Sequence, residues 1–413
     1  MPTETSLPLR RLSLLIASLL ATWAPASHAQ TDDTTPFYVG GSLGLTHVAN
    51  VYRTSNAPNS DTVTTAALLG GIDQRLGRQH VTLDGSLQDN RYSTNSDLNY
   101  RAYNVRAALD WQTVGNLSGV LSAKSDRTMA EFNTSSVAQV FNKNIVTNDE
   151  YQALARLGVA TRYTLEAGWT HQNRDYTAWQ YEQLVFSQNT AQLGVYATPA
   201  GNVRLGLVGR HTTGSNPRYP DGQGLQLIDG EIRPTTSPND YTRDDLDFTT
   251  RWSVGGYSTV NTRISRSRKR NSLDLLRDFT STTGSIGWDW RPTAKLQVNA
   301  QYARDTGQET MVQNSELNRV YTTWQLSTTY ALTGKLSLNA KASNNRATRS
   351  RDAGNAPSDA LDDTRSYTLG LRWAFSRGLS LSCQYDHVNR DNSLSTYVYT
   401  ASSYGCTGQA IFF

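Results

Sequence analysis

Charged side chains in this chain recur at even spacings within segments that are otherwise rich in uncharged polar residues. Arg106 and Asp110 illustrate the spacing, as do Asp247 and Arg251. Because successive side chains of a β-strand point to opposite faces, residues at even spacing share one face. Charged rings on the inner face of a pore tune its selectivity, whereas opposite charges on that face can instead form ion pairs that brace the wall.

The predicted set of inward-facing charges contains both signs, so it predicts no strong ion selectivity. The choice between residues that line a pore and ion pairs that brace the wall stays open. The candidates are Arg106, Asp110, Lys124, Glu166, Arg204, Arg210, Asp247, Arg251, Arg263, Asp289, Lys341 and Arg372.

A basic run is the second candidate site. It consists of Arg263, Arg266, Arg268, Lys269 and Arg270. Such a cluster suits an anionic polysaccharide, and salt would weaken the binding because it screens exposed charges. The same residues suit contact with lipopolysaccharide phosphates at a membrane rim, or simple solvation. The sequence leaves these three interpretations open.

Two cysteines, Cys383 and Cys406, are placed for a disulfide across a final hairpin. They are equidistant from a turn centred between Leu394 and Ser395. A small even number of cysteines in an oxidising compartment permits such a bridge.

The phase of the last strand conflicts with this bridge. Cys406 shares a strand face with Phe412, whereas the assembly signal of barrel C-termini would place Ile411 and Phe413 outward. Both assignments hold only if a β-bulge shifts the register.

The sequence predicts no enzyme, no cofactor and no metal site. No HExxH motif occurs, and no nucleophile or carboxylate partner set accompanies the histidines. The histidines that follow the predicted signal are scattered, at His47, His80, His171, His211 and His387.

The N-terminus reads as an export signal. Arg10 and Arg11 precede an apolar core over 12–20, and Ser27 and Ala29 occupy the two positions that determine cleavage. The apolar run is well short of the roughly 20 residues that a membrane-spanning helix needs. We therefore predict a signal peptide over 1–29 and a mature domain over 30–413.

The mature part alternates apolar and neutral polar residues with the period of two that is typical of strands. The segments 295–303, 335–343 and 366–375 show it most clearly. Neutral polar residues on the second face indicate a wetted interior, because a packed core would place a second apolar set there. The composition agrees, with 37% hydrophobic and 18% charged residues, 9 Trp and 21 Tyr. Lipid offers the backbone no hydrogen bonds, so a spanning sheet must close into a barrel.

Short turns and longer polar connections alternate along the chain. The turns lie at 76–79, 113–116, 159–162, 198–202, 254–257, 292–295, 332–335 and 376–379. The longer loops lie at 50–60, 91–98, 130–147, 174–182, 212–242, 266–276, 306–317, 349–362 and 389–396. Together they predict an all-β, transmembrane, antiparallel up-and-down barrel of about 18 strands, with a range of 16–20, and with its long loops outside the cell. The longest loop, 212–242, would either constrict the pore or form an external cap.

Three segments resemble the EpsL-type outer-membrane β-barrel proteins of exopolysaccharide operons, within the putative β-barrel porin class. They are 36–53, 83–122 and 144–169. The third contains a strand pair that ends in the sequence LEAGW at 165–169. The resemblance implies a role in exopolysaccharide biosynthesis or export, with exopolysaccharide and periplasmic export proteins as partners. It transfers no catalytic residues.

The leading hypothesis from sequence is thus a passive, hydrated pore in the outer membrane of a Gram-negative cell that serves exopolysaccharide export. The alternative is a general or substrate-specific porin for small solutes, and a third class is a plugged barrel that acts as a platform. Outer-membrane lipids, lipopolysaccharide and the barrel-assembly machinery are expected partners. The formal net charge of +4 is too mild to indicate nucleic acid.

Overall fold

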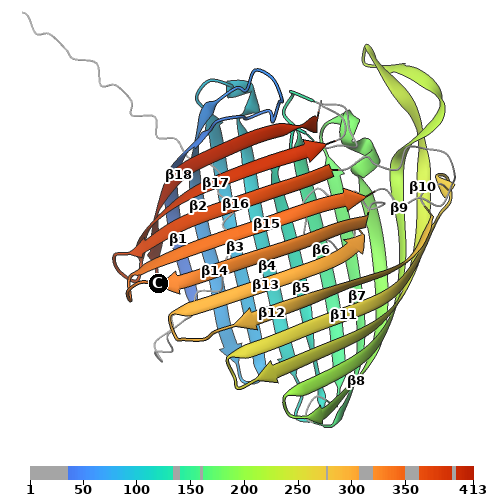
Figure 1. The fold of residues 1–413 in the computed structure, drawn as a ribbon, viewed down its shortest axis with the longest axis vertical. Helices are drawn as coiled ribbons and strands as arrows, with labels where there is room; N and C mark the ends of the chain where they lie inside the picture. The colour runs from blue at the N-terminus through green and yellow to red at the C-terminus, as the bar shows by residue number, and fades with distance from the viewer. Residues whose placement is uncertain are drawn as a thin grey trace, which may run out of the picture.

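The chain forms a closed antiparallel barrel, seen in a computed structural model (Figure 1) that describes residues 36–133, 140–158, 161–275, 278–306, 320–348, 362–392 and 397–413. Consecutive strands pair along an 18-stranded sheet, and β1 pairs with β18 to close it. The predicted all-β barrel of about 18 strands is confirmed. The predicted signal peptide lies outside the described residues.

The strands are β1 (Phe37–Val48), β2 (Asp61–Leu76), β3 (Gln79–Tyr92), β4 (Tyr100–Gln112), β5 (Leu117–Met129), β6 (Ile145–Leu157), β7 (Tyr163–Tyr176), β8 (Phe186–Ala200), β9 (Val203–Ile228), β10 (Glu231–Val254), β11 (Ser258–Asn271), β12 (Phe279–Trp290), β13 (Leu296–Thr306), β14 (Val320–Ala331), β15 (Leu336–Thr348), β16 (Asp362–Ala374), β17 (Leu379–Asn392) and β18 (Tyr399–Phe412). Two short 3-10 helices, η1 (Ser96–Leu98) and η2 (Trp179–Leu184), lie in loops. No helix among the described residues has the length and apolar character needed to cross a membrane.

An apolar face covers the outside of the barrel. In β10, Leu246, Phe248 and Trp252 are exposed, whereas Asp245 and Asp247 on the opposite face are buried. The register continues this division across neighbouring strands, since Phe248 pairs with Leu207 on β9 and with Ile264 on β11. A continuous apolar outer face with a polar inner face is the pattern of barrels that span an outer membrane. We call the two ends of the barrel the turn end and the loop end.

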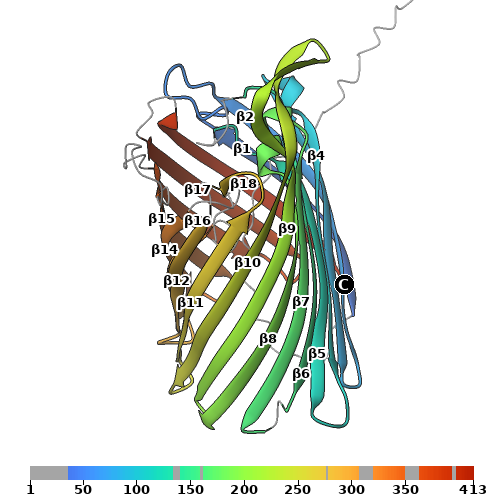
Figure 2. The same ribbon diagram turned by 90° about the vertical axis from the view of Figure 1, so that its right-hand side faces the viewer.

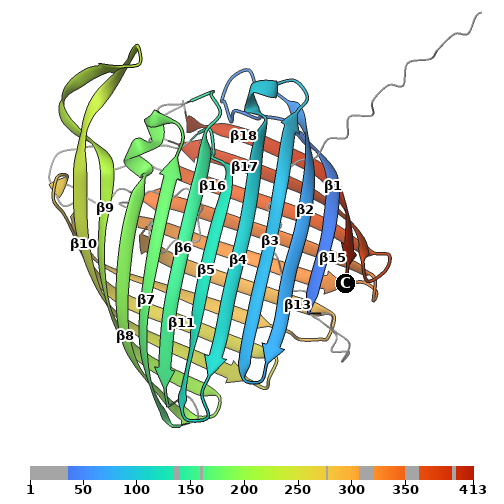
Figure 3. The same cartoon turned by 180° about the vertical axis from the view of Figure 1, so that it is seen from behind.

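The segment 212–242 is a pair of strands and not a loop. The alternative of a pore constriction is wrong, because the part beyond the barrel wall projects outward. β9 and β10 continue past their neighbours as a two-stranded hairpin that rises above the loop end (Figures 2 and 3). The tight turn is made by Asp229 and Gly230, both with positive φ. The prolines do not stop the strands, because Pro234 lies at a register shift and an irregularity tolerates a residue that lacks an N–H. The predicted loop 266–276 is also shorter, since β11 continues to Asn271.

A carboxylate braces this hairpin where its register shifts. Asp221 accepts hydrogen bonds from Thr235 Oγ1 at 2.5 Å, from Ser237 Oγ at 3.0 Å and from the Gln223 backbone N–H at 2.9 Å. These donors, Thr235 first, hold the pKa of Asp221 below its usual value because they stabilise the charged form.

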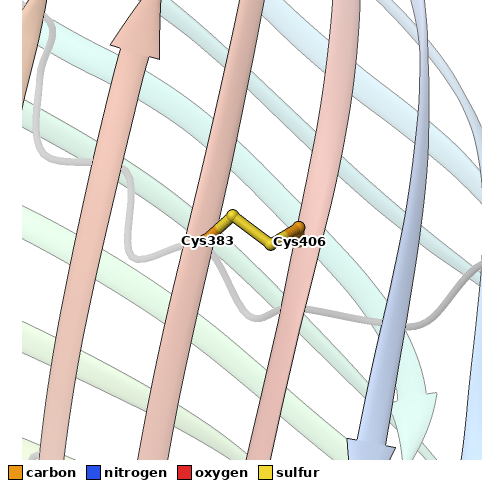
Figure 4. The surroundings of a disulfide bond; sticks show 2 residues. All are labelled: Cys383 and Cys406. Atoms are coloured by element: carbon orange, nitrogen blue, oxygen red, sulfur yellow. A yellow bond between two sulfur atoms is a disulfide. The ribbon is translucent and has the colours of Figure 1, made fainter.

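Cys383 and Cys406 form a disulfide between β17 and β18 (Figure 4). They are register partners with Cα atoms 4.0 Å apart, and the pairing of these strands has no bulge. Both share the outer face with Tyr385 and Phe412. The predicted outward position of Ile411 is therefore wrong, because an unshifted register turns Phe412 outward.

We expect the bridge to be present in protein extracted from membranes without reductant. Alkylation before reduction should add no mass, and alkylation after reduction should add two groups. Two thiols that react in the unreduced protein would contradict the bridge. Loss of the bridge in Cys406→Ser should lower the free energy of unfolding by about 3 kcal/mol, because a cross-link removes entropy from the unfolded chain.

Candidate channel lumen

The inner wall carries every residue predicted to face inward. The outward side chains define the phase of each strand, and the predicted residues all have the opposite phase. Their surroundings differ, however. Some lie in a buried network of ion pairs, and others reach solvent.

The buried network lies on β9, β10, β11 and β13, toward the loop end. Arg210 approaches Asp247 to 2.8 Å, and Arg243 approaches Asp245 to 2.8 Å. Arg263 lies 3.7 Å from Asp247 and also pairs with Asp305. We call these six residues the wall network. For Arg210, Asp247 and Arg263, the interpretation as bracing ion pairs fits this geometry better than free pore lining.

The wall around this network is closed to solvent. Ser265 and Ser267 on β11 have no exposed surface, and Lys269 on the same face is 1% exposed. Lys269 Nζ lies 4.0 Å from the centre of the Tyr241 ring, which stabilises the buried ammonium through a cation–π contact.

A patch with excess positive charge lies on β6, β7, β9 and β10, nearer the turn end. Arg156 Nε donates to Glu166 Oε2 at 2.9 Å, and Arg204 Nη2 lies 3.9 Å from the same oxygen. Arg251 is the register partner of Arg204, so two inward guanidinium groups face each other across neighbouring strands. Among the described residues Arg251 has no carboxylate partner. We call Arg156, Arg204, Arg251 and Glu166 the arginine patch; its net formal charge is positive.

Tyr196 on β8 fixes the geometry of this patch. Its hydroxyl donates to Glu166 Oε1 at 3.2 Å, and Arg204 Cζ lies 4.0 Å above its ring. The ring lies so close to Gly206 that a Cβ there would come within 2.4 Å of it. Gly206 is therefore required for the ring to lie flat along the wall, where it orients both charged groups.

Further inward cations reach solvent and have no carboxylate partner in the part of the chain that the structure describes. They are Arg106, Lys341 and Arg372. Lys341 pairs in register with Ser327 and Thr368, so neutral hydroxyl groups flank it. These positions offer a passing solute exchangeable hydrogen bonds and unneutralised charge.

The remaining predicted residues have polar or ionic contacts on the same wall. Lys124 lies 3.3 Å from Asp126, and Asp289 accepts a hydrogen bond from Asn299. Asp110 lies 3.9 Å from His80. Within the described ranges no group of three potential metal ligands occurs.

Loop segments are fastened across the loop end by a set of contacts that we call the mouth cluster. Arg390 on β17 makes a two-pronged pair with Asp362 on β16, with both N–O distances 2.7 Å. Arg390 also donates to the backbone carbonyl of Asn133 at 2.6 Å. Asn133 donates to the carbonyl of Arg53, whose guanidinium lies 2.6 Å from Glu131. The cluster thereby joins the loops after β1 and β5 to a distant part of the barrel wall.

Burial and charge both act on the mouth cluster. Burial alone would lower the pKa of Arg53, but the Glu131 carboxylate raises it above its usual value. A small apolar cluster of Val51, Leu98 and Phe132 packs beside these ion pairs. The loops are therefore held by both packing and charge.

The basic run is not one surface, so the prediction of a single patch is wrong. Strand alternation turns Arg263 and Lys269 inward and Arg266, Arg268 and Arg270 outward. The three outward arginines are exposed, whereas Lys269 is buried. The sequence could have shown this division, because the run lies within a strand and alternation applies there.

Several residues of these sites were not predicted from the sequence. They are Arg53, Glu131, Asn133, Arg156, Tyr196, Arg243, Asp245, Asp305, Asp362 and Arg390.

Many solved structures match the chain over most of its length, and three of them are given below. Pseudomonas aeruginosa OccK2 (OpdF) superposes with a TM-score of 0.48 at 10% identity, covering 91% of this chain and 97% of that one. The same protein in complex with glucuronate gives 0.47 at 12% identity, covering 92% and 98%. The outer membrane protein OpdK from this organism gives 0.45 at 12% identity, covering 91% and 99%. No family model and no curated protein matches the chain, so the resemblance to EpsL-type proteins gains no support from them.

Proposed function

We propose that the protein is a passive outer-membrane channel for small hydrophilic solutes, and that its arginine patch favours solutes with an anionic group. The proposal rests on the arginine patch, in which Arg156 and Arg204 both approach Glu166 and Arg251 lies beside Arg204 without a carboxylate partner among the described residues. In a water-filled barrel such excess charge attracts anions and concentrates them locally. Arg106 and Arg372, which are exposed, and Lys341, which is partly exposed, add further positive charge along the wall.

The barrel supplies what passive passage needs. The apolar outer face places the chain in lipid, and the inner wall presents hydroxyl, amide and charged groups. Such groups replace part of the hydration shell of a polar solute as it passes. A gradient of the solute itself is a sufficient driving force.

Conductance across a planar bilayer tests the proposal. In fractionated cells the protein should be recovered with the outer membranes. After purification it should produce discrete, ohmic current steps in potassium chloride, with a permeability ratio that favours chloride. Heat-denatured protein is the control for leaks. A barrel that is correctly folded, shown by faster gel migration before boiling than after, but passes no current would contradict the channel and favour a plugged platform.

Exopolysaccharide export is the finer function that the resemblance implied, and no contact described above favours it specifically. Deletion of the gene separates the two functions. The channel proposal expects exopolysaccharide secretion to continue and uptake of a small anionic solute to fall. Loss of exopolysaccharide secretion with normal uptake of the solute would instead favour exopolysaccharide export.

A further inference from the structure

The outer face of β8 to β11 changes from apolar to polar within two register rows, close to the loop end. One row contains Leu193, Gly209, Leu246 and Arg266, each paired with the next. The row above it contains Ala191, His211, Asp244 and Arg268, and the next contains Asn189, Thr213, Thr242 and Arg270. Figure 2 shows these four strands side by side.

Three arginines climb β11 from the edge of the apolar belt. Ile264 is the last apolar residue on the outer face of β11, and Arg266, Arg268 and Arg270 follow it at every second position. With about 3.4 Å of rise per residue, neighbouring arginines are about 7 Å apart along the strand. Because the first of them directly follows the apolar belt, the three arginines lie where the hydrocarbon of an outer membrane would give way to lipid headgroups.

These arginines are available to a ligand. Arg266 makes one long hydrogen bond, 3.3 Å to Thr282 Oγ1. Arg268 and Arg270 have no ion-pair partner among the described residues. Arg268 is the register partner of Asp244, but that carboxylate pairs instead with His211 Nδ1 at 2.7 Å.

A groove of about 620 Å³ adjoins Arg270 on this face. Its outward lining is mostly hydroxyl and amide groups, from Ser187, Asn189, Thr213, Ser215 and Thr242. Asp240 is the acidic residue of the lining and lies at the groove's outer edge, one register row beyond Arg270. The groove thus places sugar-binding groups directly beside the ladder of positive charge.

We propose that this surface is a specific site for the phosphorylated sugar headgroup of an outer-leaflet glycolipid. The arginines bind the phosphate, since guanidinium groups match phosphate geometry with paired hydrogen bonds. The hydroxyl and amide groups of the groove bind the sugar. The acyl chains lie against Leu193, Leu246 and Ile264 below. The site faces lipid and is independent of any role of the lumen.

Binding of defined lipid A in detergent tests the site. The probes are bisphosphorylated lipid A and the same lipid without phosphates, measured by native mass spectrometry in the presence of a chelator that removes bridging divalent cations. The variant Arg266→Gln/Arg268→Gln/Arg270→Gln should bind the phosphorylated lipid at least about tenfold more weakly, because each basic residue near a charged lipid surface contributes to the affinity. The lipid without phosphates should bind weakly to both proteins.

A matched triple variant controls for net charge. Arg304→Gln/Arg346→Gln/Arg365→Gln removes three outward arginines spread over β13, β15 and β16. It should bind like the unsubstituted protein. Faster gel migration before boiling than after confirms that each variant is folded. Equal losses in the two triple variants, or equal binding of lipid with and without phosphates, would overturn the proposal.

Discussion

Replacement of Arg390 by alanine should lower the free energy of unfolding by about 3–5 kcal/mol, because it leaves a buried carboxylate without its partner. Arg390 and Asp362 are 6% and 7% exposed, and their two-pronged pair is the part of the mouth cluster that is anchored on strands. The same change removes the hydrogen bond to the Asn133 carbonyl. The measurement is urea-induced unfolding from lipid vesicles, followed by tryptophan fluorescence.

Arg365→Ala is the matched control, since it removes an arginine from the neighbouring strand. Arg365 is half-exposed on the outer face and pairs with Asp363 at 2.9 Å. Exposed pairs of this kind contribute about 0–1 kcal/mol. The apolar pair Arg390→Met/Asp362→Leu should recover most of the stability, because no charge then remains buried. Equal costs for Arg390→Ala and Arg365→Ala would show that the mouth cluster does not stabilise the barrel.

Arg390→Ala should also change the current through the barrel. The loop that carries Asn133 then loses its tie to β17, so the conductance should fluctuate between levels more often than in the unsubstituted protein. Arg365→Ala should leave the current unchanged, because it lies outside the barrel.

Most of the barrel was predictable because alternation in the sequence is a direct consequence of its geometry. The strands around Leu296, Leu336 and Tyr367 each place one apolar and one neutral polar set on opposite faces. Short turns then separate these segments at regular intervals. Lipid on one side and water on the other require this pattern in every strand. An error in the predicted bounds of one segment therefore does not change the prediction of a closed sheet.

The hairpin over 212–242 was not predictable by the same rule. Beyond Ser215 and before Tyr241 its strands pair only with each other and project beyond the membrane belt, where water lies on both faces and no apolar set is needed. Without an apolar set to indicate strands, Pro217, Pro220 and Pro234 lead to the prediction of a loop. The structure tolerates these prolines because the projecting parts of β9 and β10 have no further strand to pair with, and because their mutual pairing includes register shifts.

The same error concealed the charged sites. Arg390 falls in the segment 389–396, which was predicted as a loop, and Arg243 directly follows the predicted loop 212–242; a charged residue in or beside a loop is expected to be solvated. Continuing the alternation backward from Leu246 would have placed Arg243 and Asp245 inward together. The contact of Arg390 with Asn133 could not be found in this way, because it joins loops that only the closure of the barrel brings together.

Arg204→Gln/Arg251→Gln should shift the channel toward cations, since it leaves the arginine patch with one arginine and Glu166. Each charge at about 4 Å in water contributes about 1 kcal/mol before screening, which corresponds to a change in local anion concentration of about fivefold at low salt. The reversal potential across a potassium chloride gradient measures the change. The effect should shrink at 1 M salt, where the screening length falls from about 10 Å to about 3 Å.

Arg346→Gln/Arg365→Gln provides the control, because it removes the same formal charge from the outer face of β15 and β16. Its reversal potential should match that of the unsubstituted protein. Restoring charge with Arg204→Lys/Arg251→Lys should restore the anion preference, since selectivity depends on charge in the lumen rather than on guanidinium geometry. An equal change of selectivity in Arg204→Gln/Arg251→Gln and in Arg346→Gln/Arg365→Gln would mean that the net charge of the protein governs selectivity. The arginine patch would then have no role in selecting the solute.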